Sequence, residues 1–470
     1  MDGNLPGNER ERWLTRSADH TRSQALAPVG KLKPARPNAD AKDMRRVVRE
    51  NALCASVAAA ASAAMAWLGL YGFAWNDYDN EARPALEALG HWHVLKFLQL
   101  APAYGGSLIE RAPFAVIPGL WGGGDLAVYR MLALPCLLAG AALGVWLVAR
   151  MRSEGSSRLA CAVTLAVCVA NPVTLCALEL GHPEELLGAS LCVAAVLVAA
   201  RPSIGHRGAL LAGVLLGLAI ANKQWALLAA GPVLLVLAPR QRLTCLAGAG
   251  ATALAVLGPL VVFSSGGFVA GTRALASPAS TIFQPWQLWW FLGHHGATVH
   301  GAFGEAKPGF RLAPGWIGGV AHPMILAVGA AITAGLWLRY RRLTERDALL
   351  ALALLLLLRC LLDTWDVVYY PLPFILALLA WEVRGSAARP PVLALASMAL
   401  VWVGFHWLPL HASGDVQAAS FLVWSLPLAM WLGVRLCTLP RRTLGAGSQH
   451  ERPGTQEMTV SSLGRLVRTS

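Results

Sequence analysis

The sequence carries little charge for its length. Only 14% of its 470 residues are Asp, Glu, Lys or Arg, whereas 56% are hydrophobic and the mean hydropathy is +0.51. A water-soluble protein of this length needs far more charge on its surface. The composition therefore excludes an ordinary soluble protein and predicts an all-α, polytopic membrane protein.

The sequence also lacks the motifs of common metal and nucleotide sites. Its nine cysteines show no CxxC or Cys/His spacing, so they predict small core residues rather than disulfides or a metal site. No Walker, HExxH or GxGxxG context and no Ser-His-Asp order occurs, which excludes a soluble nucleotide-using enzyme. Asp77 and Asp79 form a D-x-D pair, which can bind a divalent cation, but two carboxylates alone do not indicate a metal site. No cofactor is therefore expected.

The net charge of +13 does not predict nucleic acid as a partner, since Lys and Arg lie at the ends of apolar runs. About twelve membrane spans are predicted, at 51–74, 127–149, 159–178, 186–200, 208–222, 225–238, 243–264, 317–338, 347–362, 367–382, 391–408 and 419–436. The arginines between spans alternate so that both termini fall in the cytoplasm. The transmembrane domain is predicted to span residues 51–440, with disordered tails at 1–50 and 441–470. The first tail has no early apolar segment, so it is not predicted to be a signal peptide.

An acidic stretch, 75–83, follows the first predicted span. It contains Asp77, Asp79 and Glu81, and the outer loop after it includes 86–100, predicted as a short interfacial helix. Carboxylates are costly in lipid, so these acids are predicted to face the water outside. A carboxylate there could accept the proton of an attacking hydroxyl. The alternative is that the acids simply end a helix in water.

More polar and aromatic residues fall at predicted outer helix ends or in outer loops. As candidate substrate-binding residues we take Glu81, Arg111, Glu179, His182, Glu184, Glu185, Lys223, Trp286, His294, His295, Asp363, Asp366, Tyr369 and Tyr370. In the hairpin 179–185, spacings of three predict that Glu179, His182 and Glu185 share one helical face and bind a polar group. The alternative is a solvated turn.

Lys223 stands on the predicted outer side, against the positive-inside tendency. A cation there could neutralise a departing lipid-linked phosphate, although it could also be a lysine that reaches from the span to the interface.

A late turn, 363–371, combines acids with aromatic rings, as sugar sites do, although an aromatic-belt turn is an equal alternative. Arg359, one helical turn earlier, is expected to pair with Asp363. For Trp286 and its neighbours a membrane-interface belt is favoured over a sugar platform. His294 and His295 are weak candidates for a metal site.

Taken in order, these features resemble the glycosyltransferase C superfamily, and more narrowly its bacterial mannosyltransferase-like branch that uses polyprenyl-phosphate sugars. The resemblance covers roughly residues 50–440 and rests on the acids after the first span, the 171–185 hairpin, the 212–225 run and the late turn. It implies a catalytic carboxylate in the first outer loop, matching Asp77 or Asp79, and inverting displacement of the polyprenyl phosphate. It also implies a phosphate contact at Lys223.

The expected activity is therefore transfer of a hexose from a polyprenyl-phosphate donor to a glycolipid or glycan of the cell envelope, with mannose as the leading candidate sugar. Besides donor and acceptor, the expected partners are membrane lipids, and the expected location is the bacterial cytoplasmic membrane. A transporter or flippase of lipid-linked sugars remains the alternative, which inverted repeats and midplane charges would favour. A membrane protein without catalysis is a third class.

Overall fold

The computed structural model describes residues 52, 54–65, 77–201, 205–264, 268, 283–295, 299–300, 306–307, 309–385 and 389–440. The chain divides into two units, Met1–Ala52 and Leu53–Ser470, and nearly all described residues belong to the second. Both predicted tails, and the residues 66–76 that complete the first predicted span, lie outside the described residues.

The fold is helical, which confirms the predicted all-α class. The helices are Cys54–Met65, α3 Arg83–Gly90, α4 Val94–Leu100, α5 Gly105–Ala115, α6 Asp125–Ser153, α7 Arg158–Val169, α8 Pro172–Glu179, α9 Glu184–Ala199, α10 Gly205–Asn222, α11 Ala230–Val236, α12 Pro239–Phe263, α14 Ile317–Tyr340, α15 Glu345–Leu362, α16 Leu372–Val383, α17 Val392–Trp402 and α18 Gly414–Cys437. Short π- or 3-10 helices are η1 Tyr78–Ala82, η2 Ile117–Trp121, η4 Gln224–Ala229, η5 Trp290–Leu292, η6 Val403–Trp407 and η7 Leu408–Leu410. In the described part of the chain the only strands are β1 Val299–His300 and β2 Ala306–Lys307, which pair antiparallel.

Among the residues that the structure describes, seven helical segments are long and apolar enough to cross a membrane. They are Asp125–Ser153, Arg158–Glu179, Gly205–Asn222, Pro239–Phe263, Ile317–Tyr340, Val392–Leu410 and Gly414–Cys437. The protein is therefore membrane-embedded. The predicted count of about twelve is not confirmed, because Gln224–Val236 and Leu372–Val383 are shorter than the ~20 residues of an untilted crossing and α15 carries several charges.

The centre of the bundle is formed by α9, α15 and α16. Almost every residue of α16 is buried, which suits a helix that is apolar on all sides and surrounded by protein. At its edge α10 and α12 pack closely through glycine. A Cβ on Gly213 would come within 2.2 Å of the Cys245 carbonyl oxygen, so only glycine allows this approach.

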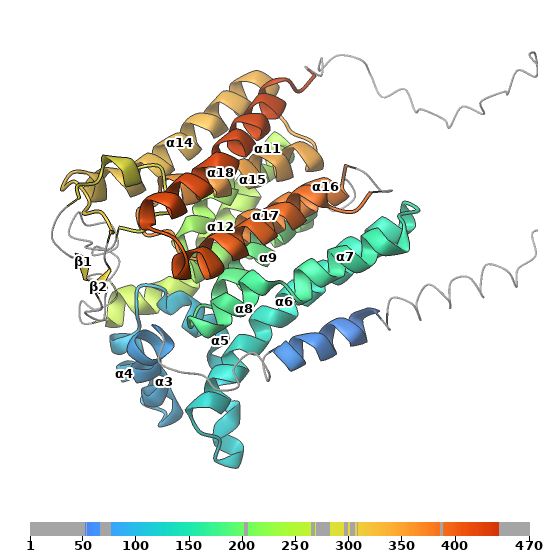
Figure 1. Ribbon diagram of the computed structural model, residues 1–470. Coiled ribbons are helices and arrows are strands. Elements are labelled where there is room, and N and C mark those ends of the chain that lie inside the picture. Colours follow the sequence, from blue (N-terminus) through green and yellow to red (C-terminus); the bar gives the residue numbers. More distant parts are fainter. Residues whose placement is uncertain are drawn as a thin grey trace, which may run out of the picture. The chain divides into compact units, whose positions relative to one another are not determined.

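The ends of the bundle differ in chemistry. At the end where α6 turns into α7 (right in Figure 1), Arg150 lies 3.5 Å from Glu345, and Arg384 pairs with both Glu154 and Glu345. The opposite end carries α3, α4 and the β1–β2 pair (left in Figure 1). Several helices that end or begin there carry the predicted site residues.

Candidate functional site

The turn between α8 and α9 positions the centre of the site. Gly181 adopts φ +94°, a left-handed conformation that suits glycine and ends the first helix. A Cβ there would lie 2.5 Å from the backbone nitrogen of Tyr78, so the turn packs directly against η1. Glu184 and Glu185 then open α9, where the helix dipole favours carboxylates.

His182 joins two carboxylates from opposite sides. Its Nε2 lies 3.1 Å from Asp77 Oδ2, and its Nδ1 lies 2.8 Å from Glu184 Oε1. The imidazole is held against the ring of Tyr369 at a centroid distance of 4.6 Å. The Asp77 side chain is 36% exposed, whereas Glu184 is fully buried. A row of carboxylate, imidazole and carboxylate thus leads from the surface into the bundle.

Two cations compensate the buried charge of Glu184. Lys223 Nζ lies 3.1 Å from its Oε1, and Arg111 donates to its Oε2 at 3.2 Å. Asn222 donates to its backbone carbonyl at 2.8 Å. The Lys223 ammonium also lies 4.5 Å from the centroid of the Tyr104 ring. Removing a charge from so well compensated a group would leave its partners buried and unpaired.

The network continues through Glu185 to α15. Lys223 lies 3.6 Å from one Glu185 oxygen and Arg359 lies 3.8 Å from the other. The Arg359 guanidinium is 5.0 Å from the centroid of the Trp225 ring and 4.2 Å from that of Tyr370, so it also gains cation–π attraction.

Two acids of the late turn lie beside this network. Asp363 pairs with His322 at 3.5 Å and accepts from the Trp365 amide, so the expected Arg359 pairing is replaced by a histidine from α14. Asp366 is fully buried, and neither of its carboxyl oxygens has a hydrogen-bond partner. Burial and neighbouring Asp363 raise the pKa of Asp366 well above its usual range, which favours the neutral acid.

The other predicted acids differ in their relation to the cluster. Asp79 pairs with Arg83 at 3.4 Å. Glu81, exposed on η1, interacts electrostatically with His182, Asp77 and Lys223, so it lies beside the cluster. Glu179 is exposed at the end of α8, so its predicted shared face with His182 is wrong, because Gly181 ends the helix between them.

The tryptophans at 286, 289 and 290 anchor the segment 283–295 to the bundle. Trp286 donates Nε1 to the Gly404 carbonyl at 3.2 Å, and Trp289 donates to that of Leu362 at 2.8 Å. Trp286 and Trp289 are buried, and Trp290 is fully so. The favoured interface belt and the alternative sugar platform both need exposed rings, so the structure contradicts both at Trp286.

His294 and His295 lie with a separate surface cluster. His294 forms a β-bridge with Leu312, and His295 lies 3.6 Å from Asp415. Arg311 binds the same carboxylate at 2.7 and 2.8 Å. Within the residues that the structure describes, no group of three or more His, Cys, Asp or Glu side chains is arranged to hold a metal ion.

Several residues of the site were not predicted from the sequence. Asn222 and Trp225 lie close to the predicted Lys223 in the sequence, and Tyr104 lies between α4 and α5. His322 had the clearest signal, a polar side chain inside an apolar span, which is costly unless it has a partner or a function.

Comparison with family models, curated proteins and solved structures finds no match for this chain. Fold and site together define a membrane-embedded helical protein with a buried ionisable network that reaches the surface at Asp77.

The protonation of His182 makes a testable contribution to stability. Burial and the Lys223 ammonium oppose it, but Glu184 and Asp77 outweigh them and raise the pKa of His182 from 6.5 to about 9. Because the folded-state pKa is the higher one, this stabilisation is complete below about pH 6.5 and is lost as pH rises through about 9. We expect wild type to lose its thermal-stability advantage over His182→Gln across that interval. Melting curves of both proteins in detergent measure this, and a pH-independent difference would contradict it.

Proposed function

We propose that the protein is a membrane glycosyltransferase that moves a hexose from a polyprenyl-phosphate donor to a cell-envelope glycolipid or glycan. Mannose is the leading candidate sugar. The observation that carries this proposal is the Asp77–His182–Glu184 row. A sugar acceptor is a weak nucleophile until a positioned base takes its proton. Asp77 is part exposed, and a buried imidazole holds it in place. These are the properties that such a base needs.

The proposed reaction is a single displacement with inversion. The acceptor oxygen forms a bond to the anomeric carbon as the bond from that carbon to the phosphate oxygen breaks. The bonding electrons leave with the polyprenyl phosphate, and the hydroxyl proton passes to Asp77. His182 acts as a positioning residue, since Glu184 orients its ring and its second nitrogen meets Asp77. We assign Lys223, 15% exposed and tied to Glu184, to contact with the departing phosphate.

We place the site on the outer face of the bacterial cytoplasmic membrane, with both termini inside. The support is the separation of charges along the bundle. Arginines of the α6–α7 and α16–α17 connections gather at one end, and the Asp77 network lies at the other. Cytoplasmic loops carry an excess of Lys and Arg, so the arginine-rich end is assigned to the cytoplasm.

The test is sugar transfer by the purified protein in liposomes that contain polyprenyl-phosphate mannose and a lipid-glycan acceptor. We expect a mannosylated acceptor whose new linkage has the anomeric configuration opposite to that of the donor. The same assay with donors that carry other hexoses distinguishes an enzyme that uses a different sugar from a protein that catalyses no sugar transfer. Movement of donor across the bilayer, with no transfer from any donor, would overturn the proposal in favour of the flippase alternative.

A further inference from the structure

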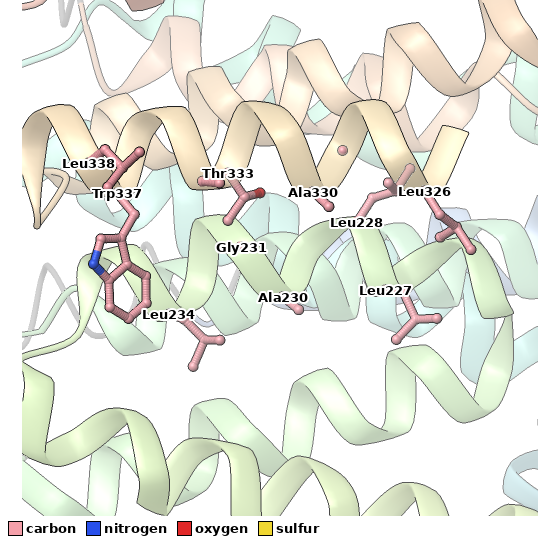
Figure 2. A pocket seen from close by; sticks show the side chains of 12 residues that line it. Leu227, Leu228, Ala230, Gly231, Leu234, Leu326, Ala330, Thr333, Trp337 and Leu338 are labelled. Carbon is pink, nitrogen blue, oxygen red and sulfur yellow. The ribbon is translucent and has the colours of Figure 1, made fainter. Parts of the chain in front are cut away.

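An apolar groove of about 550 Å³ runs between the η4–α11 segment and α14. Figure 2 shows the two helical walls and the side chains that line the groove. The lining residues are Leu227, Leu228, Ala230, Gly231, Leu234, Leu326, Gly329, Ala330, Thr333, Ala334, Trp337 and Leu338. None of them is charged, and the only side-chain polar groups are those of Thr333 and Trp337. Its volume is within the range of small-ligand sites, ~300–1,000 Å³.

Both walls of the groove lead to the polar network. Leu227 follows Lys223 by four residues, and Leu326 follows His322 by four. Each wall of the groove therefore begins about one helical turn from an ionisable side chain. Lys223 is tied to Glu184, and His322 is tied to Asp363. This end of the groove therefore adjoins the candidate active site.

Arg242 contacts both walls at the other end of the groove. Arg242 donates from Nε to the Leu234 carbonyl at 3.0 Å and from Nη2 to the Arg341 carbonyl at 2.6 Å. Its guanidinium also lies 4.4 Å from the centroid of the Trp337 ring. Arg242 thus bridges the two walls at the end of the groove that lies away from Lys223 and His322.

The groove is long enough to hold the part of a lipid chain that spans one leaflet. Leu326 and Leu338, at its two ends, are twelve residues apart on α14, which at 1.5 Å per residue is about 18 Å. The hydrocarbon core of a bilayer is about 30 Å thick, so the groove is longer than one leaflet. Leu326 and Leu338 are more than half exposed, so a chain can enter sideways from the membrane.

We propose that this groove binds the hydrocarbon chain of a polyprenyl phosphate, with the phosphate at the Lys223–His322 end and the tail directed toward Arg242. The inference rests on the proposed function for the identity of the lipid, and it adds where the lipid lies. A lipid with its chain in this groove would present its phosphate to Lys223. Lys223 pairs with Glu184, which in turn contacts the His182 ring.

Filling the groove tests this inference. A Cβ on Gly329 would meet the flexible ends of Leu228, at 2.8 Å, and Leu355, at 3.9 Å, and Gly329 lines the groove, so Gly329→Leu adds bulk there. Ala330→Leu is a second variant that fills the groove from an exposed position. The control is Gly335→Leu on the same helix, where a Cβ meets nothing within 4 Å and which does not line the groove.

The probe is a polyprenyl phosphate with a photoactivatable group in its chain, reconstituted with full-length protein in liposomes. We expect labelled peptides from both walls, and labelling roughly tenfold lower in Gly329→Leu and Ala330→Leu but unchanged in Gly335→Leu. Equal labelling of all four proteins, or competition by a two-chain phospholipid as strong as by unlabelled polyprenyl phosphate, would overturn the inference.

The assay separates this inference from the proposed function because labelling needs no turnover. Labelling that depends on Gly329 supports the groove even if no donor yields a transferred sugar, in which case the proposed function alone fails. Sugar transfer by wild type, with labelling insensitive to both groove-filling variants, would remove the groove alone.

Discussion

Asp77→Asn is expected to lower kcat/KM for sugar transfer by about 10²–10⁴-fold, the usual contribution of a general base. The amide keeps the shape of the side chain but cannot accept the proton of the acceptor hydroxyl. Since a base acts in the transition state, the loss should fall on kcat and leave KM for the donor nearly unchanged. Steady-state transfer in liposomes, with donor and acceptor varied in turn, measures both constants.

Asp79→Asn is the matched control. Asp79 lies two residues away and pairs with Arg83 rather than His182. Its variant should stay within about threefold of wild type, less than 1 kcal/mol in activation free energy. An Asp77→Asn enzyme as active as wild type, or a larger loss in Asp79→Asn, would refute the assignment of the base.

Glu184→Gln is expected to have the largest effect on stability. Glu184 is the shared counter-charge of Lys223, Arg111 and protonated His182, and its side chain is fully buried. Breaking a buried ion pair by removing one partner costs about 3–5 kcal/mol, because the remaining charge stays buried and unpaired. Denaturant unfolding in detergent measures this loss in free energy of unfolding.

The control for this prediction is Glu179→Gln, the same chemical change at an exposed residue, which should alter stability by no more than about 0.5 kcal/mol. Lys223→Met in the Glu184→Gln background removes one uncompensated cation and should recover part of the loss. Equal stability of Glu184→Gln and Glu179→Gln would show that the cluster does not depend on this charge.

Long apolar runs made the helical class and the positions of most helices predictable from the sequence. The number of spans was not, because a run such as 367–382 contains both a turn and a helix. Its first residues form the connection that holds Tyr369 and Tyr370, and α16 begins only at Leu372. Hydrophobicity alone does not distinguish a central helix enclosed by protein from one that crosses lipid.

The residues of the network were largely predictable, since His182, Glu184, Lys223 and Asp363 follow or begin apolar runs at one predicted face. Their pairing was not. The partner of His182 depends on the left-handed Gly181, which ends α8 and turns the ring toward Glu184 rather than Glu179.

Contacts between distant segments were the least accessible to sequence reasoning. Trp289 is buried because it donates to a carbonyl at the end of α15, 73 residues later. The groove likewise depends on two small residues that face side chains of the opposite wall, Gly231 against Thr333 and Gly329 against Leu228. A single sequence holds no signal for either arrangement.

The central claim, that Asp77 promotes sugar transfer from a lipid carrier, is tested most directly by one paired measurement. Wild type and Asp77→Asn are reconstituted at equal amounts with polyprenyl-phosphate mannose and acceptor, and the mannosylated product is followed over time. The account predicts product of inverted configuration with wild type and almost none with Asp77→Asn, although both proteins bind the photoactivatable carrier equally. Product formed at the same rate by both, or none from either while the donor crosses the bilayer, would contradict it.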